Sequence, residues 1–295
     1  MNGYCISYDF AGEYRKIVQA APKVIALLDK TPKKFEFFDT PVDLYPVLIA
    51  IYGHALGYVG EFAQAEKECE RALILAQQGG NPYSLGWVEF MYGCQYLPKG
   101  DGRNAVKHLH NSTGYFEKVG ALAVLQVAWS LLASGYSLLG ESDNALEYFR
   151  KMHEVQTDIE SPGFLSLGHL ASSSAYLNSG NLDEAKVHAE KALNLGQTHH
   201  ERYCEGSSWL LLGRIVGKME GSNLDEAEEC ILNGMKILDE LETKPAYAVG
   251  CLNLAELYMR AGRKEKALEN LRRSQEMFSQ MGMDQWLERV KNLAG

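Results

Sequence analysis

The chain has 295 residues, of which 46% are hydrophobic and 23% charged, so its composition excludes an intrinsically disordered protein. Its formal net charge of -9 argues against nucleic acid or an anionic membrane as a target of the surface as a whole. The six cysteines are scattered without a CxxC pair, and no basic-then-apolar leader opens the chain. Reduced, packed thiols in a cytoplasmic protein are therefore expected.

The first 43 residues form a partial unit of their own. Residues 12–29 read as an amphipathic helix, like the second helix of a hairpin whose first helix is missing. We therefore expect the natural chain to have begun further upstream. Residues 31–42 contain Pro32 and Pro41 and read as a long connection, with an aromatic cluster at Phe35, Phe37 and Phe38.

Residues 44–281 carry a repeat with a period of about forty. Six alanines are separated by 40, 40, 40, 42 and 40 residues. They are Ala65, Ala105, Ala145, Ala185, Ala227 and Ala267. Self-similarity at a fixed period of this size predicts stacked helical hairpins, each of which buries a face against the next.

Residues 127–152 illustrate one unit. Trp129, Leu132 and Tyr136 recur on one face of a helix, and Gly140 ends that helix because glycine adopts the left-handed conformation without strain. A second helix follows at once, and Ala145 on its apolar face lets the two helix axes approach closely.

Two units depart from this pattern. The fifth has two extra residues in its turn around Gly221. In the second, Pro98 precedes the turn glycine, which predicts that the first helix of this unit ends early.

Residues 119–140 carry no charge over 22 positions, long enough to span a bilayer, but they follow the repeat register. A helix packed between neighbours on both sides explains them better.

Residues 282–295 read as a terminal amphipathic helix that caps the stack, with Trp286 and Val290 facing inward. The expected fold is therefore all-α. It is an α-α superhelix, or solenoid, of about six hairpin repeats with one further helix at each end, wound with a right hand.

The succession of a large residue, leucine, a small residue, tyrosine, the turn glycine and alanine is the tetratricopeptide pattern, here with longer helices than usual. Four segments extend the resemblance: FEFFDTPVDLY, NPYSLGW, HHERYCEGSSWLLLGRI and MFSQMGMDQWLERV. Together they resemble the C-terminal tetratricopeptide region of bacterial proteins that join a class III adenylate/guanylate cyclase to an AAA-type ATPase. This resemblance implies a regulatory module without catalytic residues.

Neither a metal site nor a catalytic site emerges from the sequence. His200 and Cys204 stand four residues apart, but a zinc site needs three or four ligands and no further cluster lies nearby. The three consecutive serines at 172–174 fit close helix packing better than nucleophilic catalysis. We therefore expect no enzyme activity, no cofactor and no metal.

The concave wall, lined by the first helix of each hairpin, is the candidate binding site. Its inward positions grade from aromatic through hydroxyl-rich to basic. They are His54, Tyr58, Trp87, Phe90, Ser134, Ser174, Asn178, Arg214, Lys218 and Arg260. The basic end can hold a carboxylate or phosphate, and the aromatic end can anchor a hydrophobic side chain.

The leading hypothesis is a non-enzymatic interaction module that binds a peptide or a sister domain in this groove, with the cyclase and ATPase domains of the same natural chain as candidate partners. The alternative is a small-ligand sensor of the kind found in tetratricopeptide transcription activators, which predicts an enclosed pocket. Self-association through the groove or an end also stays open. Replacing Arg214 and Lys218 should weaken an acidic partner without changing the melting temperature.

Overall fold

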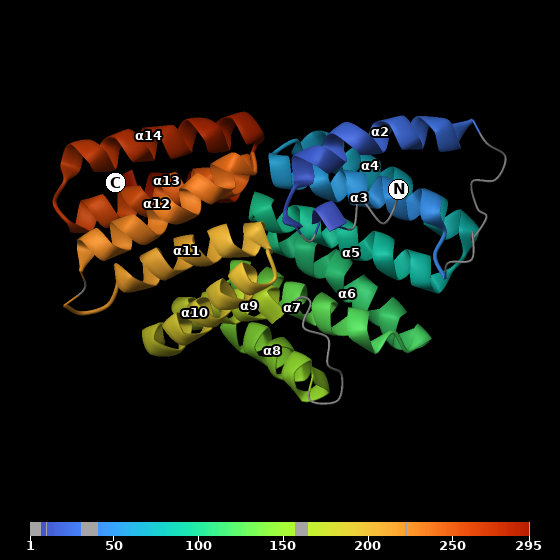
Figure 1. Ribbon diagram of the computed structural model, residues 1–295, viewed down its shortest axis with the longest axis horizontal. Helices are drawn as coiled ribbons and strands as arrows, with labels where there is room; N and C mark the ends of the chain where they lie inside the picture. The colour runs from blue at the N-terminus through green and yellow to red at the C-terminus, as the bar shows by residue number, and fades with distance from the viewer. Residues whose placement is uncertain (1–6, 10, 31–40, 157–164, 222, 295) are drawn as a thin grey trace.

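The computed structural model describes residues 7–9, 11–30, 41–156, 165–221 and 223–294 (Figure 1). Within these ranges the chain is helical and contains no strand, which confirms the all-α prediction. The aromatic cluster expected at Phe35, Phe37 and Phe38 lies outside the described residues.

The helices pair as consecutive hairpins, with α2 (Tyr14–Asp29) before the first pair and α15 (Asp284–Ala294) after the last. The pairs are α3 (Leu44–Val59) with α4 (Phe62–Gly79), α5 (Pro82–Lys99) with α6 (Gly102–Val119), α7 (Leu122–Leu138) with α8 (Ser142–Gln156), α9 (Leu165–Asn178) with α10 (Leu182–Thr198), α11 (Arg202–Val216) with α12 (Leu224–Glu240), and α13 (Lys244–Arg260) with α14 (Lys264–Met281).

The recurring alanines lie inside the hairpins, as the spacing predicts. All six are at most 2% exposed, each on the second helix of its pair. Small residues of the first helix face them: a Cβ built on Gly213 would lie 2.7 Å from the carbonyl oxygen of Ala227, and the hydroxyl of Ser173 donates to the carbonyl of Ala185 at 2.7 Å. Two backbones thus meet where larger side chains would force them apart.

The turns that connect one hairpin to the next also contain a residue in the left-handed conformation. Gly80 and Gly120 take φ of 69° and 68° there. The corresponding turn before α11 has His200 with φ of 59°, and the turn before α13 has Glu242 with φ of 55°. The turn geometry therefore persists even where the sequence does not supply glycine.

The prediction that the first helix of the second unit ends early is wrong. Helix α5 continues through Pro98 to Lys99, and Gly100 caps it with φ of 83°. Proline fixes φ near the helical value, so in a last turn it removes one backbone hydrogen bond without ending the helix. The fifth unit does have a longer turn, since α11 ends at Val216 and α12 begins at Leu224.

The uncharged stretch forms α7, which packs against α6, α8 and α9. Contact with neighbours on several sides explains its apolar character. Among the residues that the structure describes, no helix is long and apolar enough to cross a membrane.

The two ends of the solenoid meet, so the stack closes into a ring (Figure 1). Helix α13 contacts α3 and α5. The rings of Tyr58 and Tyr203 lie 4.9 Å apart, and Phe62 of α4 is buried in a cluster formed mainly by α13, α14 and α15. A Cβ built on Gly60 would lie 2.6 Å from the sulfur of Met281. We call this junction of the first two hairpins with α11 and with α13 to α15 the seam.

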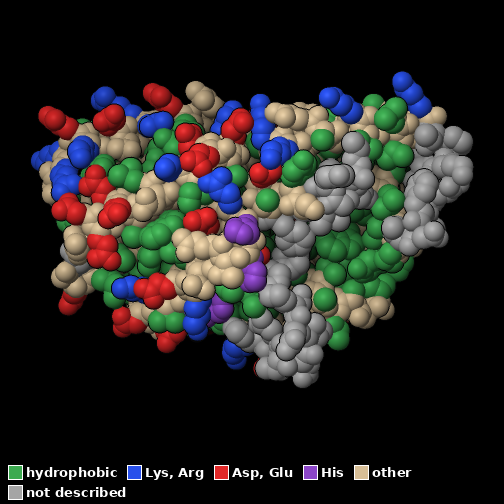
Figure 2. Space-filling model, viewed as in Figure 1, with side chains coloured by type: hydrophobic (Ala, Val, Ile, Leu, Met, Phe, Trp, Pro, Cys, Tyr) green, Lys and Arg blue, Asp and Glu red, His purple; other side chains and the backbone are tan. Residues whose placement is uncertain are grey.

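Charge is distributed unevenly around the ring. On the face that Figure 2 shows, most of the lysine, arginine and acidic side chains gather over the C-terminal helices α11 to α14. Hydrophobic side chains occupy more of the opposite half of this view.

Candidate functional site

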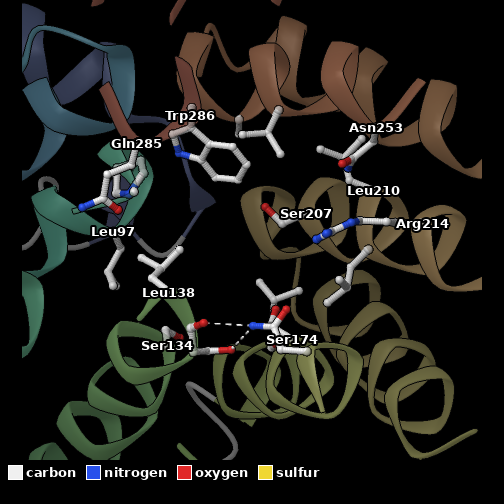
Figure 3. Close-up of a pocket in the computed structure, with 18 of the residues that line it drawn as sticks. Leu97, Ser134, Leu138, Ser174, Ser207, Leu210, Arg214, Asn253, Gln285 and Trp286 are labelled. Atoms are coloured by element: carbon white, nitrogen blue, oxygen red, sulfur yellow. Dashed lines mark hydrogen bonds between the residues drawn. The ribbon is translucent and has the colours of Figure 1, made fainter. Parts of the chain in front are cut away.

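The ring surrounds a partly open cavity of about 640 Å³. The first helix of each hairpin contributes to its wall, because this helix faces the centre of the ring while the second helix faces outward. Helix α3 contributes Tyr58. Figure 3 shows Ser134 of α7, Ser174 of α9 and Arg214 of α11 around the cavity. The terminal helix α15 adds Trp286.

One side of the cavity is apolar and rich in hydroxyl groups. Leu97 and Leu138 lie together there, close to Ser134 and opposite Arg214 (Figure 3). The hydroxyl of Ser134 donates to the carbonyl of Ser130 at 3.2 Å, so its oxygen keeps lone pairs that can accept a hydrogen bond from a ligand.

Two polar contacts stabilise this wall. The amide nitrogen of Asn178 donates to the backbone carbonyl of Ser137 at 2.9 Å and lies 3.2 Å from the Ser137 hydroxyl. The hydroxyl of Ser174 donates to the carbonyl of Leu170 at 3.1 Å. The first contact ties α9 to α7 across adjacent hairpins, so the wall is held in place before any ligand enters.

The opposite side is basic. The Nε of Arg214 lies 3.6 Å from Glu256 Oε2, too far for a hydrogen bond, and it has no hydrogen-bond partner among the described residues. Glu256 instead accepts from Arg289 Nε at 3.1 Å. Burial, followed by the nearby charge of Arg289, lowers the pKa of Arg214 to about 10 despite the attraction of Glu256.

Further basic groups lie beside Arg214. Lys218 and Arg260 line a small hollow that shares Arg214 and Asn253 with the main cavity. Burial and then the charge of Arg214 lower the pKa of Lys218, and Glu256 opposes this effect. Positive charge therefore exceeds negative charge at this end of the cavity.

Two more buried polar atoms near the cavity wall have no hydrogen-bond partner within the described ranges. They are Oδ1 of Asn253, whose side chain is 5% exposed, and Nε1 of Trp286. Buried polar groups are normally paired, and an orphaned one in a cavity wall is a position where a ligand atom or water fits. The indole of Trp286 stacks on Phe278 and reaches Gly100 across the seam.

The structure gathers some of the residues proposed from the sequence and separates others. Tyr58, Ser134, Ser174, Asn178 and Arg214 all line the cavity.

Lys218 and Arg260 line the neighbouring small hollow, whereas His54, Trp87 and Phe90 do not line the cavity. His54 is buried with its Nε2 2.9 Å from Asp9, and Trp87 packs on Phe90 at a ring distance of 5.5 Å. Helices α3 and α5 reach the cavity only with their C-terminal ends, which explains this difference.

Other lining residues were absent from the sequence-based set, among them Tyr203, Ser207 and Arg289. Tyr203 and Ser207 precede Arg214 by eleven and seven residues on α11, the spacing of one helix face. Extending the stripe from Arg214 toward the start of its helix would have found them. Arg289 belongs to the helix that was interpreted as a cap.

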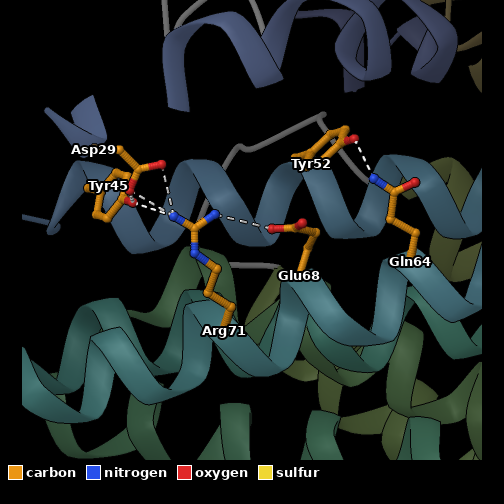
Figure 4. A network of polar contacts seen from close by, with 6 residues as sticks. All are labelled: Asp29, Tyr45, Tyr52, Gln64, Glu68 and Arg71. Atoms are coloured by element: carbon orange, nitrogen blue, oxygen red, sulfur yellow. Dashed lines mark hydrogen bonds and ion pairs between the residues drawn. The ribbon is translucent and has the colours of Figure 1, made fainter. Parts of the chain in front are cut away.

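A second polar cluster joins α2, α3 and α4 (Figure 4). Arg71 donates to Asp29 at 2.9 Å and to the hydroxyl of Tyr45 at 2.6 Å, and Tyr45 itself donates to Asp29. Burial, assisted by the bond to Asp29, raises the pKa of Tyr45 to about 12. These groups satisfy one another, so we interpret the cluster as an anchor for α2.

The described residues contain no group of three or more histidine, cysteine or acidic side chains placed to hold a metal ion. His200 lies in the turn before α11, while Cys204 is buried inside that helix. Burial raises the pKa of the Cys204 thiol to about 12. This thiol is protonated at neutral pH, which suits packing rather than metal binding.

Comparison with known proteins agrees with the observed fold. Residues 168–199 and 248–280 match the tetratricopeptide repeat family. No curated protein sequence matches the chain.

Several solved structures are similar in fold. A Rap protein complexed with competence and sporulation factor has a TM-score of 0.67 at 16% identity, over 95% of this chain and 78% of its own. A signal transduction ATPase with a tetratricopeptide repeat sensor from Pyrococcus horikoshii has a TM-score of 0.57 at 17% identity, over 93% of this chain and 42% of its own. The apo quorum sensor NprR from B. thuringiensis has a TM-score of 0.51 at 16% identity, over 99% of this chain and 87% of its own. The chain thus carries tetratricopeptide repeats in a tetratricopeptide-like solenoid.

Proposed function

We propose that this chain is a non-enzymatic binding module of a cytoplasmic bacterial signalling protein. Its ligand is a short peptide segment, or a segment of a sister domain, that enters the central cavity. The observation that carries the proposal is the closed ring, which surrounds a cavity of about 640 Å³ whose wall holds buried polar atoms without hydrogen-bond partners among the described residues. Such convergent polar groups in a concave, mostly preformed site are typical of ligand binding.

The similar structures support this proposal at the level of fold. One of them was solved with competence and sporulation factor, one is a quorum sensor, and one is an ATPase whose repeats are described as a sensor. Repeats attached to an ATPase also agree with the resemblance to cyclase–ATPase proteins. We propose on these grounds that the module regulates enzyme domains of the same natural chain.

A small-ligand sensor is the second candidate, favoured by one particular observation. Contact between the first and last hairpins turns an open groove into a partly open central cavity, and its volume lies within the range of about 300–1,000 Å³ usual for small-molecule sites. The two candidates share the same site and differ in the ligand.

Affinity selection tests the proposal and separates the two candidates. The full chain is incubated with a library of short peptides and, separately, with a mixture of cytoplasmic metabolites, and retained molecules are identified by mass spectrometry. Ser174→Trp fills the cavity, so it should lose every specific ligand. Ser179→Trp is the matched control, because Ser179 is exposed outside the cavity lining. Retention of the same ligands by Ser174→Trp would contradict the proposal.

A further inference from the structure

We infer that the cavity binds an amphipathic anion, with its anionic end against Arg214 and Asn253 and its apolar part along the leucines of the opposite wall. The inference rests on the proposed function and names the chemical class of the ligand. A carboxylate or phosphate on an apolar chain has this chemistry, and so does a hydrophobic peptide with a free C-terminus.

Charge at the basic end is the first observation. The charged groups that act on Lys218 are Arg214, Arg289, Arg260 and the single carboxylate of Glu256. Glu256 Oε1 accepts hydrogen bonds from Arg289, and Glu256 Oε2 forms an ion pair with Arg214 at 3.6 Å, so one carboxylate serves two arginines. Arg214 and Arg289 line the cavity, while Lys218 and Arg260 line the adjoining hollow. In a chain with a net charge of -9, this local excess of positive charge is not a consequence of composition. The Arg214 side chain is only 20% exposed, and an anion in the cavity would balance the positive charge that the single carboxylate of Glu256 leaves over.

The unpaired atoms at this end form the second observation. Nε of Arg214 can donate a hydrogen bond, and Oδ1 of Asn253 can accept one. Both residues line the cavity, and Figure 3 places them on the same side of it, with Ser207 nearby. A charge-assisted bond from Arg214 to an anionic oxygen is the strongest contact this wall can offer. Asn253 would accept from an N–H or O–H beside that oxygen.

The opposite end gives the third observation. Leu97 and Leu138 face the cavity across from Arg214, and Leu131 and Leu167 also line it. A ligand that covers apolar surface gains about 25 cal/mol of binding free energy for each Å² removed from water. A small hydrophilic anion would leave these leucines uncovered, so the ligand that fits both ends has an anionic head and an apolar body.

The test uses defined probes on the full chain by isothermal titration calorimetry. Decanoate and decyl phosphate carry both an anionic head and an apolar body. Decanol has the apolar body without the charge, and succinate has charge without the apolar body. A pentapeptide of leucine and valine, with a free or an amidated C-terminus, covers the peptide source. We expect decanoate, decyl phosphate or the free peptide to bind at least tenfold more tightly than the uncharged counterpart, and succinate to bind weakly. The anion that binds most tightly identifies the source.

Variants then assign the preference to Arg214. Arg214→Met should reduce the preference for the anionic over the uncharged probe to less than threefold. Arg214→Lys keeps the charge and should retain most of this preference. Arg202→Met is the matched control, since Arg202 pairs with Glu240 outside the cavity. Circular dichroism and the melting temperature show that each variant is folded.

Two results would overturn the inference: equal affinity for decanol and decanoate, or an unchanged preference in Arg214→Met. Loss of binding in Ser174→Trp combined with no charge preference would leave the proposed function intact and reject only the anionic head. Binding that survives Ser174→Trp would reject both.

Discussion

We expect Arg214 to destabilise the unliganded protein. Burial lowers its pKa to about 10, so the folded state holds this proton less tightly than the unfolded state. This penalty is fully present at pH 7 and decreases as the pH rises above 10. We expect Arg214→Met to raise the free energy of unfolding at pH 7 by about 1 kcal/mol, because Glu256 keeps Arg289 as its partner.

Urea unfolding of both proteins at pH 7 and pH 10.5 measures this effect, and the difference between them should shrink at the higher pH. A less stable Arg214→Met protein at pH 7 would show that the contact with Glu256 matters more than burial. The sequence alone predicted no change in melting temperature for a substitution here. It treated Arg214 as a groove surface residue and could not reveal its burial.

His200 offers a second prediction at the scale of single residues. It occupies with φ of 59° the turn position that Gly80 and Gly120 hold between earlier hairpins. A non-glycine residue in this conformation costs about 1 kcal/mol. His200→Gly should therefore raise the melting temperature, as differential scanning calorimetry can measure. His199→Gly is the control, with φ of -100°, and should not stabilise.

Among the helices, small residues at the hairpin contacts let the two helices of each repeat pack closely. Ala185 is fully buried on α10, and its carbonyl accepts from Ser173 of α9. Ala185→Leu should lower the free energy of unfolding by about 1–3 kcal/mol, because the helix axes must separate. Val187→Leu, on the same helix but 42% exposed, should change it by less than about 0.5 kcal/mol. Equal effects in chemical denaturation would refute the role assigned to the alanines.

The helices were largely predictable because the signals that define them are local. A small residue at a hairpin contact and a glycine in a turn act within one unit, so their spacing is visible in the chain itself. Pro98 is the exception, since its cost depends on its place within the last turn of α5. For the site, the first-helix positions Ser134, Ser174 and Arg214 were visible as one wall.

The closure of the ring is a property of the whole molecule and could not be predicted. It depends on the small rotation between successive hairpins, which accumulates over six units and leaves no residue pattern. For that reason the sequence did not reveal that α15 and Tyr203 share the cavity with Tyr58. It equally could not reveal that Trp87 and Phe90 sit beyond the part of α5 that reaches the cavity.

Phe62 is the residue that tests the seam. It is buried in the cluster of α13, α14 and α15, so Phe62→Ala should cost about 3–5 kcal/mol and let the ring open. Small-angle X-ray scattering should then report a larger radius of gyration. Phe116→Ala is the matched control, because Phe116 is equally buried but belongs to the packing of α5 against α6. An unchanged radius in Phe62→Ala would mean that other contacts hold the seam.

Contact of α13 with α3 and α5 has a consequence for how the chain acquires its structure. In an open array each unit depends only on its immediate neighbours, and folding can spread from any point and stop at either end. Here the last step joins distant parts of the polypeptide, and such non-local pairing is slow because a long loop must close first. A ribosome-bound chain therefore cannot complete the binding chamber until α13 to α15 have emerged, however early its first hairpins form.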